Sequence, residues 1–350
     1  MMIQSLYRTY NRYRTLQTDK ISSLPIVILM PHSSCNCRCV MCDIWKGNQQ
    51  LKQLNETDIR SLLGTLKKFQ TQRVVMSGGE ALLNPNFFRF CEILKARKIK
   101  ISLLSTGLTI RKNASQLVKW VDDVIVSIDG DGALHDEIRN VPGVYAKLKE
   151  GIAALKSIHP GFRVTGRTVI HRLNFRHWPA IIDSAKEIGL DRISFLPADV
   201  SSHAFNREIA WDEQRQHEIL PREDELNELQ AMIYQVIAGY SNDFMTGFIA
   251  ESPGKIQMIH DHYAAYYDHC EFPYKKCNAP WVSAVIEADG TVRPCFFHPA
   301  IGNIKAAPLD AIVNSAAAIA FRKNLDTNEN ETCKKCVCYL NLSPGKNPGL

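Results

Sequence analysis

Short apolar runs alternate with amphipathic stretches along the first 200 residues of the chain. Each apolar run has the length of a buried strand, and the stretches between have apolar residues at helical spacing. The predicted strands are residues 25–30, 73–76, 99–104, 123–128, 162–170 and 192–196, and the predicted helices are 58–69, 87–96, 114–120, 144–158 and 181–188. Strand–helix repetition of this kind predicts an α/β fold with a parallel sheet and right-handed crossovers.

This alternation stops after residue 197. Residues 198–275 are polar, with long helices predicted over 223–237 and 254–267. We expect this bridging region to help close the open end of the sheet and to shield a site there from water. Most of its histidines are expected on the surface: His203, His217, His260, His262 and His269. Residues 1–23 are basic, and a packed helix and a loosely docked terminus are both open interpretations.

Four cysteines follow the first predicted strand within eight residues. Cys35, Cys39 and Cys42 have the spacing C-x3-C-x2-C, while Cys37 falls outside it. One loop with this spacing can place three thiolates around a cubane cluster and leave the fourth iron open. A disulfide knot is disfavoured in a 350-residue chain without a secretory signal, whereas zinc remains an alternative.

Polar residues mark the ends of the later strands. Gly78 and Gly79 let the backbone approach a ligand closely, and Glu80 adds an acceptor beside them. Ser127 ends another strand, and Arg167 lies on a strand with a planar fork suited to a carboxylate. Ordinary turn chemistry for the serine and a structural salt bridge for the arginine are the alternatives.

A second cysteine group lies near the end of the chain. Asp289-Gly290 is a hairpin signal between Cys277 and Cys295, and Cys333 and Cys336 form a C-x2-C pair. Four thiolates gathered in this way fit a zinc site or a fully ligated [4Fe-4S] cluster. Cys338 is a nearby thiol that is an alternative to one of these ligands, and His298 is expected to lie in the shell of the site.

The C-x3-C-x2-C motif with a Gly-Gly-Glu turn after the next strand resembles the radical S-adenosylmethionine (radical SAM) enzymes. The resemblance implies a partial (β/α)6 TIM-like barrel. It also implies that Cys35, Cys39 and Cys42 hold a [4Fe-4S] cluster whose open iron binds SAM, and that the reduced cluster cleaves SAM to methionine and a 5′-deoxyadenosyl radical. The SAM contacts implied are Gly78, Gly79, Glu80, Ser127 and Arg167. Met41 replaces the aromatic residue usual before the last cysteine.

Two further segments extend the resemblance. The segment 127–130, followed by His135, Asp136 and Arg139, resembles a strand end and turn of peptide-modifying and related radical SAM enzymes. The spacing C-x12-G-x4-C that starts at Cys277 resembles the SPASM and Twitch extensions of the family. Because a full SPASM extension has seven cysteines, we expect the shorter Twitch form. The implied ligands of its single auxiliary [4Fe-4S] cluster are Cys277, Cys295, Cys333 and Cys336.

The domain limits expected from these patterns are an N-terminal segment (1–23), a barrel core (24–200), the bridging region (201–275) and an auxiliary cluster domain (276–345). The net charge of +6 is spread out and does not indicate nucleic acid. The apolar run 24–30 is too short to span a membrane, so neither a membrane nor a nucleic acid is an expected partner. A cytoplasmic location is expected, and the resemblance implies a flavodoxin- or ferredoxin-type electron donor.

Three functions are consistent with these features. The favoured one is oxidation, epimerisation or rearrangement of a small molecule, such as a sugar or natural product. The alternatives are a maturase that modifies a ribosomal peptide and a non-catalytic metal-binding protein. The peptide function is weakened because only about two dozen residues precede the first strand, which is too few for a folded leader-binding domain. The sequence names no catalytic acid or base.

Overall fold

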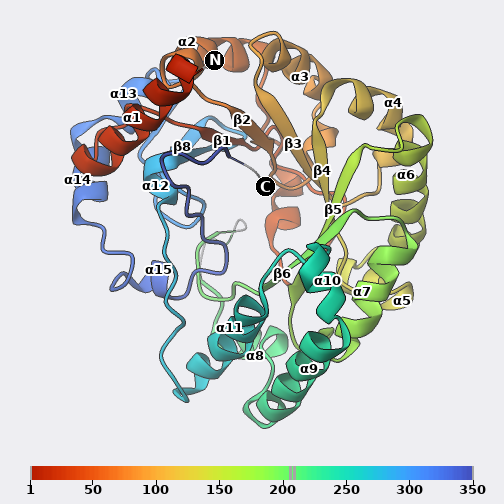
Figure 1. Cartoon of the computed structure of the whole chain (residues 1–350). Helices are drawn as coiled ribbons and strands as arrows, with labels where there is room; N and C mark the ends of the chain where they lie inside the picture. The colour runs from red at the N-terminus through yellow and green to blue at the C-terminus, as the bar shows by residue number, and fades with distance from the viewer. Residues whose placement is uncertain (1, 205–206, 208–209, 349–350) are drawn as a thin grey trace.

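The computed structural model describes residues 2–204, 207 and 210–348. Its described part contains a nine-stranded sheet in the order β6-β5-β4-β3-β2-β1-β7-β8-β9. Six neighbours in this order are parallel, and Figure 1 shows them as an arc with helices outside it. They are β1 (Ile26–Leu29), β2 (Arg73–Met76), β3 (Lys100–Ser105), β4 (Asp123–Ser127), β5 (Arg163–Ile170) and β6 (Arg192–Pro197). The predicted α/β fold is confirmed.

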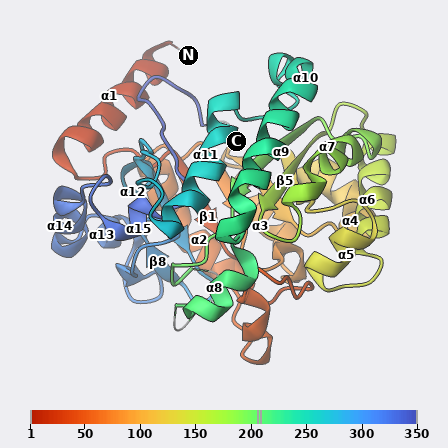
Figure 2. The same cartoon turned by 90° about the horizontal axis from the view of Figure 1, so that it is seen from below.

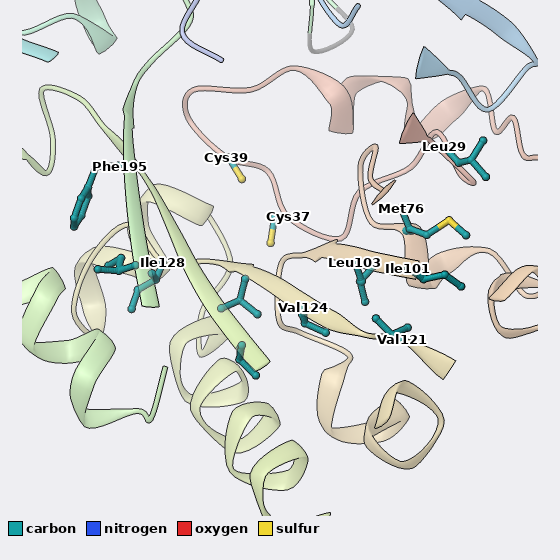
Figure 3. Close-up of a cluster of buried hydrophobic side chains, with 14 of the residues drawn as sticks. Leu29, Cys37, Cys39, Met76, Ile101, Leu103, Val121, Val124, Ile128 and Phe195 are labelled. Atoms are coloured by element: carbon teal, nitrogen blue, oxygen red, sulfur yellow. The ribbon is translucent and has the colours of Figure 1, made fainter. Parts of the chain in front are cut away.

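One face of this sheet packs against helices. The main ones are α2 (Glu56–Lys68), α3 (Phe87–Lys95), α4 (Ile110–Trp120), α6 (Val144–Ile158) and α7 (Trp178–Glu187). Asn55 caps α2 by accepting from the Asp58 backbone N–H at 3.0 Å, and the Asp58 carboxylate accepts from the Asn55 N–H at 2.9 Å. Leu29, Met76 and Leu103 lie in the large core that results (Figure 3).

The carboxyl-terminal segment packs against the other face of the sheet. Leu342 is 5% exposed and packs with Ile26, Val75 and Val282. The Arg73 Nε donates to the carbonyl of Pro348 at 3.1 Å. Figure 1 accordingly places the C-terminus near the centre of the arc. The chain's own tail therefore fills part of the inside of the open barrel.

The bridging region continues from β6. Its helices are α8 (Glu213–Ile219), α9 (Leu226–Gly239), α10 (Ser241–Thr246) and α11 (Pro253–Ala264), which lie together in Figure 2. Ile193 in β6 bonds to this region through Phe248 and Ala250, with N···O distances of 2.8 Å. His203, His217 and His269 are exposed as predicted.

The surface prediction is wrong for His262. Its side chain is 1% exposed, and its ring packs against Tyr263, Tyr266 and Phe272 at centroid distances of 5.5 Å. The residue follows the apolar periodicity of α11, which turns this position toward the interior.

The last part of the chain extends the same sheet. β7 (Ser283–Ile286) is parallel to β1, with Ile286 opposite Leu29, and β8 (Thr291–Arg293) and β9 (Gly302–Asn303) follow antiparallel. The helices α12 (Ala279–Val282), α13 (Leu309–Val313), α14 (Ala316–Asn324) and α15 (Glu331–Lys334) complete this part. The N-terminal segment forms α1 (Met2–Thr18), and Asp19 after it accepts from the Trp281 indole at 2.8 Å.

Candidate radical SAM site

The loop that carries the first cysteine group starts at the carboxyl end of β1 and lies above the neighbouring strand ends (Figure 3). Its Arg38 and Val40 N–H groups donate to the carbonyls of Arg139 and Ile138, both at 3.0 Å, in helix α5 (Ala133–Arg139). The Asn48 side chain closes the loop from the other side through two hydrogen bonds to the backbone of Cys35, at 2.9 and 3.0 Å. The thiols therefore extend from a backbone that is fixed at both ends.

The environments of the thiols differ. Burial, with a smaller contribution from the neighbouring Cys39, raises the pKa of Cys35 and of Cys42 to about 12. A hydrogen bond from Cys37 and the Arg139 cation lower the pKa of Cys39 to about 6, although burial opposes them. The hydrogen bond that Cys37 makes to Cys39, together with burial, raises the pKa of Cys37.

The cysteine loop fits an iron–sulfur cluster in its donor set. Soft thiolates are the preferred ligands of such clusters, and metal binding displaces the protons of thiols with raised pKa. Within the described residues, no three histidine, cysteine, aspartate or glutamate side chains form a finished coordination site. The structure thus gathers the predicted thiols on one loop without the final ligand geometry.

Gly79 is required by its contact with this loop. A Cβ at this position would lie 2.1 Å from the carbonyl oxygen of Ser34 and 2.9 Å from the backbone nitrogen of Cys35. Gly78 has a φ of +110°, which favours glycine. The two glycines therefore let β2 end directly against the cysteine loop.

The side chain of Glu80 forms hydrogen bonds with residues at the end of β3. Its side chain is fully buried, and Oε2 accepts from the Ser105 hydroxyl at 2.9 Å and from the Thr106 N–H and hydroxyl at 2.9 and 2.8 Å. Burial raises the pKa of Glu80, while these hydrogen bonds oppose the rise. The carboxylate thus joins the ends of β2 and β3, a function that the sequence does not indicate.

Asp129 and Arg139 connect the end of β4 to the cysteine loop. Arg139 donates to the Asp129 carboxylate and, through Nη1, to the Cys39 sulfur at 3.4 Å. Asp129 is fully buried and also accepts from the Val169 N–H at 2.9 Å. Both residues belong to the strand end and turn that resemble those of peptide-modifying radical SAM enzymes, but the sequence pattern gives neither of them this role.

The bridging region holds the loop from its outer side. The Trp211 indole donates to the Asp43 carboxylate at 2.8 Å, and the Arg215 guanidinium donates to the Val40 carbonyl. The Arg207 guanidinium stacks on the Trp211 ring at 3.9 Å. The two hydrogen bonds to the loop join residues about 170 positions apart in the chain, so no local sequence pattern predicts them.

Ser127 and Arg167 are direct partners in the register of β4 and β5. The Arg167 Nε donates to the Ser194 hydroxyl at 3.2 Å. Arg167 lines a cavity of about 150 Å³ with Glu251, Lys275 and the fully buried His262. The structure therefore places the two predicted residues together, whereas the Gly-Gly turn lines a different cavity.

The second cysteine group lies on the segments that flank the β7–β8 hairpin and on α15 with the turn after it, and among the described residues no three of its thiols form a finished coordination site. Burial, with a smaller contribution from the neighbouring thiols, raises the pKa of Cys295 to about 11 and that of Cys333 to about 12. Burial also raises the pKa of Cys336, and the exposed Cys338 adds to the rise in pKa of Cys336 and of Cys295. His298 is 4% exposed, and its Nε2 lies 3.3 Å from the Cys333 sulfur, as expected for a residue in the shell of the site.

A cavity of about 570 Å³ lies between the two cysteine regions. Met30, Gly78 and Gly79 line it from the strand ends, and Glu287 and Arg293 line it from the β7–β8 hairpin. The hairpin charges are paired: Arg293 lies 2.7 Å from Glu287, and Lys52 lies 3.2 Å from Asp289. Phe296 and Phe297 add aromatic surface.

Comparison with known families identifies both halves of the site. Residues 29–185 match the radical SAM superfamily, and these residues include the cysteine loop and the Gly-Gly-Glu turn. The chain belongs to the radical SAM superfamily. Residues 277–337 match SPASM, an iron–sulfur cluster-binding domain. This radical SAM enzyme therefore uses a [4Fe-4S] cluster with SAM, and its SPASM domain binds auxiliary iron–sulfur.

Two curated relatives resemble most of the radical SAM chain. A cysteine-type anaerobic sulfatase-maturating enzyme of Clostridium novyi is 23% identical over 91% of this chain and 86% of its own. The subtilosin biosynthesis protein AlbA of Bacillus subtilis is 24% identical over 87% of this chain and 62% of its own. The Fe-coproporphyrin III synthase of Methanosarcina barkeri is 26% identical, but over 55% of this chain and 49% of its own, so the chain matches about half of that relative.

Solved structures share the fold. SuiB of Streptococcus suis, bound to its precursor peptide SuiA, has a TM-score of 0.64 and 15% identity, over 93% of this chain and 73% of that one. The enzyme anSMEcpe, with AdoMet and a peptide bound, has a TM-score of 0.65 and 17% identity, over 90% and 89%. Within the described residues, no helix is both long and apolar enough to cross a bilayer.

Proposed function

We propose that this radical SAM enzyme modifies a peptide by abstracting a hydrogen atom from one of its residues. The observation that carries the proposal is the cavity of about 570 Å³ between the cysteine loop and the SPASM hairpin. The pairing of β7 with β1 places these two parts side by side although they are far apart in the chain. A substrate residue in this cavity would contact both regions at once.

The relatives that match most of the chain favour a peptide over a small molecule. Their names concern sulfatase maturation and bacteriocin biosynthesis, and the solved structures of similar fold include complexes with peptides. These relatives support modification of a ribosomal peptide, which the sequence alone favours less than a small-molecule reaction. A small molecule remains the second candidate substrate, because the cavity volume lies within the range of about 300–1,000 Å³ typical of small-molecule sites.

The proposed roles of the residues follow from their positions. Cys35, Cys39 and Cys42 hold the first cluster, which with SAM supplies a 5′-deoxyadenosyl radical. Gly78 and Gly79 allow the backbone after β2 to lie against the cysteine loop, and Glu80 joins the ends of β2 and β3 beneath it. Arg167 is the proposed contact for the carboxylate of SAM, since a guanidinium pairs well with a carboxylate, and Ser127, its partner in the strand register, is a further proposed SAM contact.

We assign the auxiliary cluster to Cys277, Cys295, Cys333 and Cys336. The five thiols of this region, including Cys338, are enough for one cubane, which takes four ligands, but not for two. Only one cluster is therefore proposed here, with Cys338 as a neighbour.

The test is a comparison of substrates under anaerobic conditions. The protein is reconstituted with iron and sulfide, reduced, and given SAM with or without a synthetic peptide encoded beside its gene. We expect the peptide to increase 5′-deoxyadenosine formation and to change in mass. The proposal fails if SAM is cleaved but the peptide neither changes in mass nor stimulates cleavage, while a small molecule from the same gene neighbourhood does both.

A further inference from the structure

Arg139 makes a contact that the proposed function leaves unused. It is the last residue of α5, its side chain is 8% exposed, and its Nη1 donates to the Cys39 sulfur at 3.4 Å. Its other terminal nitrogen donates to Asp129, which is fully buried at the end of β4. One guanidinium thus connects the middle cysteine of the loop to the barrel.

The backbone of the same residue supports this contact. The Arg139 carbonyl accepts from the Arg38 N–H, and the Ile138 carbonyl accepts from the Val40 N–H, both at 3.0 Å. These two hydrogen bonds flank Cys39 on either side. The end of α5 therefore fixes both the main chain and the sulfur of this cysteine.

Asp129 fixes the guanidinium in turn. One carboxylate oxygen pairs with Arg139, and the other accepts from the Val169 N–H at 2.9 Å. The Asp129 main-chain carbonyl accepts from the Asn174 side chain at 2.9 Å. A guanidinium stays protonated in proteins, and the ion pair with Asp129 holds this charge beside the Cys39 sulfur.

The charge acts on a sulfur that would carry electron density from the cluster. Hydrogen bonds to sulfur and nearby net charge set the reduction potential of iron–sulfur clusters. Because reduction adds an electron, a cation in contact with one ligand favours the reduced state. The N–H···S bond acts in the same direction.

We propose that Arg139 is a positioning residue that orients Cys39 and raises the reduction potential of the cluster on the cysteine loop. The proposal rests on the cluster assignment in the proposed function and is independent of whether the substrate is a peptide. Asp129 acts through Arg139 by holding its planar fork between carboxylate and sulfur, a geometry that lysine lacks.

The test is a potentiometric titration followed by electron paramagnetic resonance. The wild type, Arg139→Lys and Arg139→Gln are reconstituted, and the first cluster is identified as the signal that changes when SAM is added. Arg73→Lys is the matched control. Arg73 also forms a buried ion pair, with an N···O distance of 2.7 Å to Asp123, but this pair does not contact the cysteine loop. Iron and sulfide content are measured in every sample.

We expect a more negative midpoint potential in both Arg139 variants, lower for Gln than for Lys, and an unchanged value in the control. Loss of the SAM-responsive cluster alone in both variants, with the auxiliary cluster retained, would also support the positioning of Cys39. The proposal would be overturned if the Arg139→Gln protein binds its full iron content and keeps the wild-type potential. If the Arg139→Gln protein does not bind the first cluster, the same result for a loaded Arg139→Lys protein would overturn it. Absence of any SAM-responsive signal in the wild type would instead refute the proposed function.

Discussion

At the scale of single residues, the site depends on side chains that organise the backbone as much as on those that bind ligands. Glu80 illustrates this point, because its Oε2 already accepts three hydrogen bonds from Ser105 and Thr106. Its position next to the Gly-Gly turn could be predicted from the sequence, but its partners could not. They lie on the neighbouring strand, and pairing between strands is a tertiary property.

Gly79 gives a direct prediction. Gly79→Ala would place a methyl group against the backbone of Ser34 and Cys35, and overpacking of this kind costs about 1–3 kcal/mol. We expect lower stability in urea unfolding and loss of iron from the first cluster. Gly64→Ala is the control, because Gly64 lies in α2 with nothing within 4 Å of an added Cβ and should gain about 0.5–1 kcal/mol. Equal effects of the two substitutions would contradict the contact.

His262 predicts a pH dependence of stability. Burial lowers its folded-state pKa from 6.5 to about 3, so the unfolded chain binds a proton at pH values where the folded chain does not. This contribution to stability is present above pH 6.5 and is lost as the pH falls toward 3, with a limiting slope of about 1.4 kcal/mol per unit.

We therefore expect His262→Phe, which keeps the aromatic packing, to reduce the slope of unfolding free energy against pH below about 6.5. His269→Phe is the control, because His269 is exposed. Parallel slopes for wild type and His262→Phe in urea titrations would show that His262 titrates normally.

At the scale of elements, the strand–helix pattern was enough to predict β1 to β6 and the main helices between them, but not the short helix α5, which carries Arg139. Boundaries differ where local signals are weak: α4 begins at Ile110 rather than 114, and α7 begins at Trp178 with Pro179 in its first turn. Two arrangements were not predictable. The pairing of β7 with β1 and the packing of Leu342 inside the barrel join segments hundreds of residues apart, where no local period applies.

The tail contact predicts a loss of stability. Leu342→Ala would leave a cavity among Ile26, Val75 and Val282, at a cost of about 2–5 kcal/mol. Leu173→Ala is the control, because Leu173 is 39% exposed. Urea midpoints compare the two, and a Leu342 variant as stable as the control would show that the tail is dispensable for the barrel.

At the scale of the whole molecule, one sheet carries two cysteine groups with a cavity between them. The ligand types were predictable because cysteine spacing is local in each group, whereas the cavity arises only when β7 joins β1. Two groups on one rigid sheet predict that either cluster can load without the other.

Iron analysis tests this independence. A variant with Cys35, Cys39 and Cys42 all replaced by alanine should retain about four irons per chain, the content of one cubane. Adding Cys336→Ala should remove that iron, whereas adding Cys338→Ala should leave it in place. Zinc in place of iron, or iron loss with Cys338→Ala alone, would contradict the ligand assignment.

The most direct test of the account is SAM cleavage by a pair of variants in the cysteine loop. Cys39→Ala removes a proposed ligand, and Cys37→Ala removes the neighbouring thiol that lies outside the motif. With reductant and SAM under nitrogen, we predict that Cys37→Ala still forms 5′-deoxyadenosine and that Cys39→Ala forms none. Wild-type production by Cys39→Ala would contradict the claim that this loop holds the cluster that cleaves SAM.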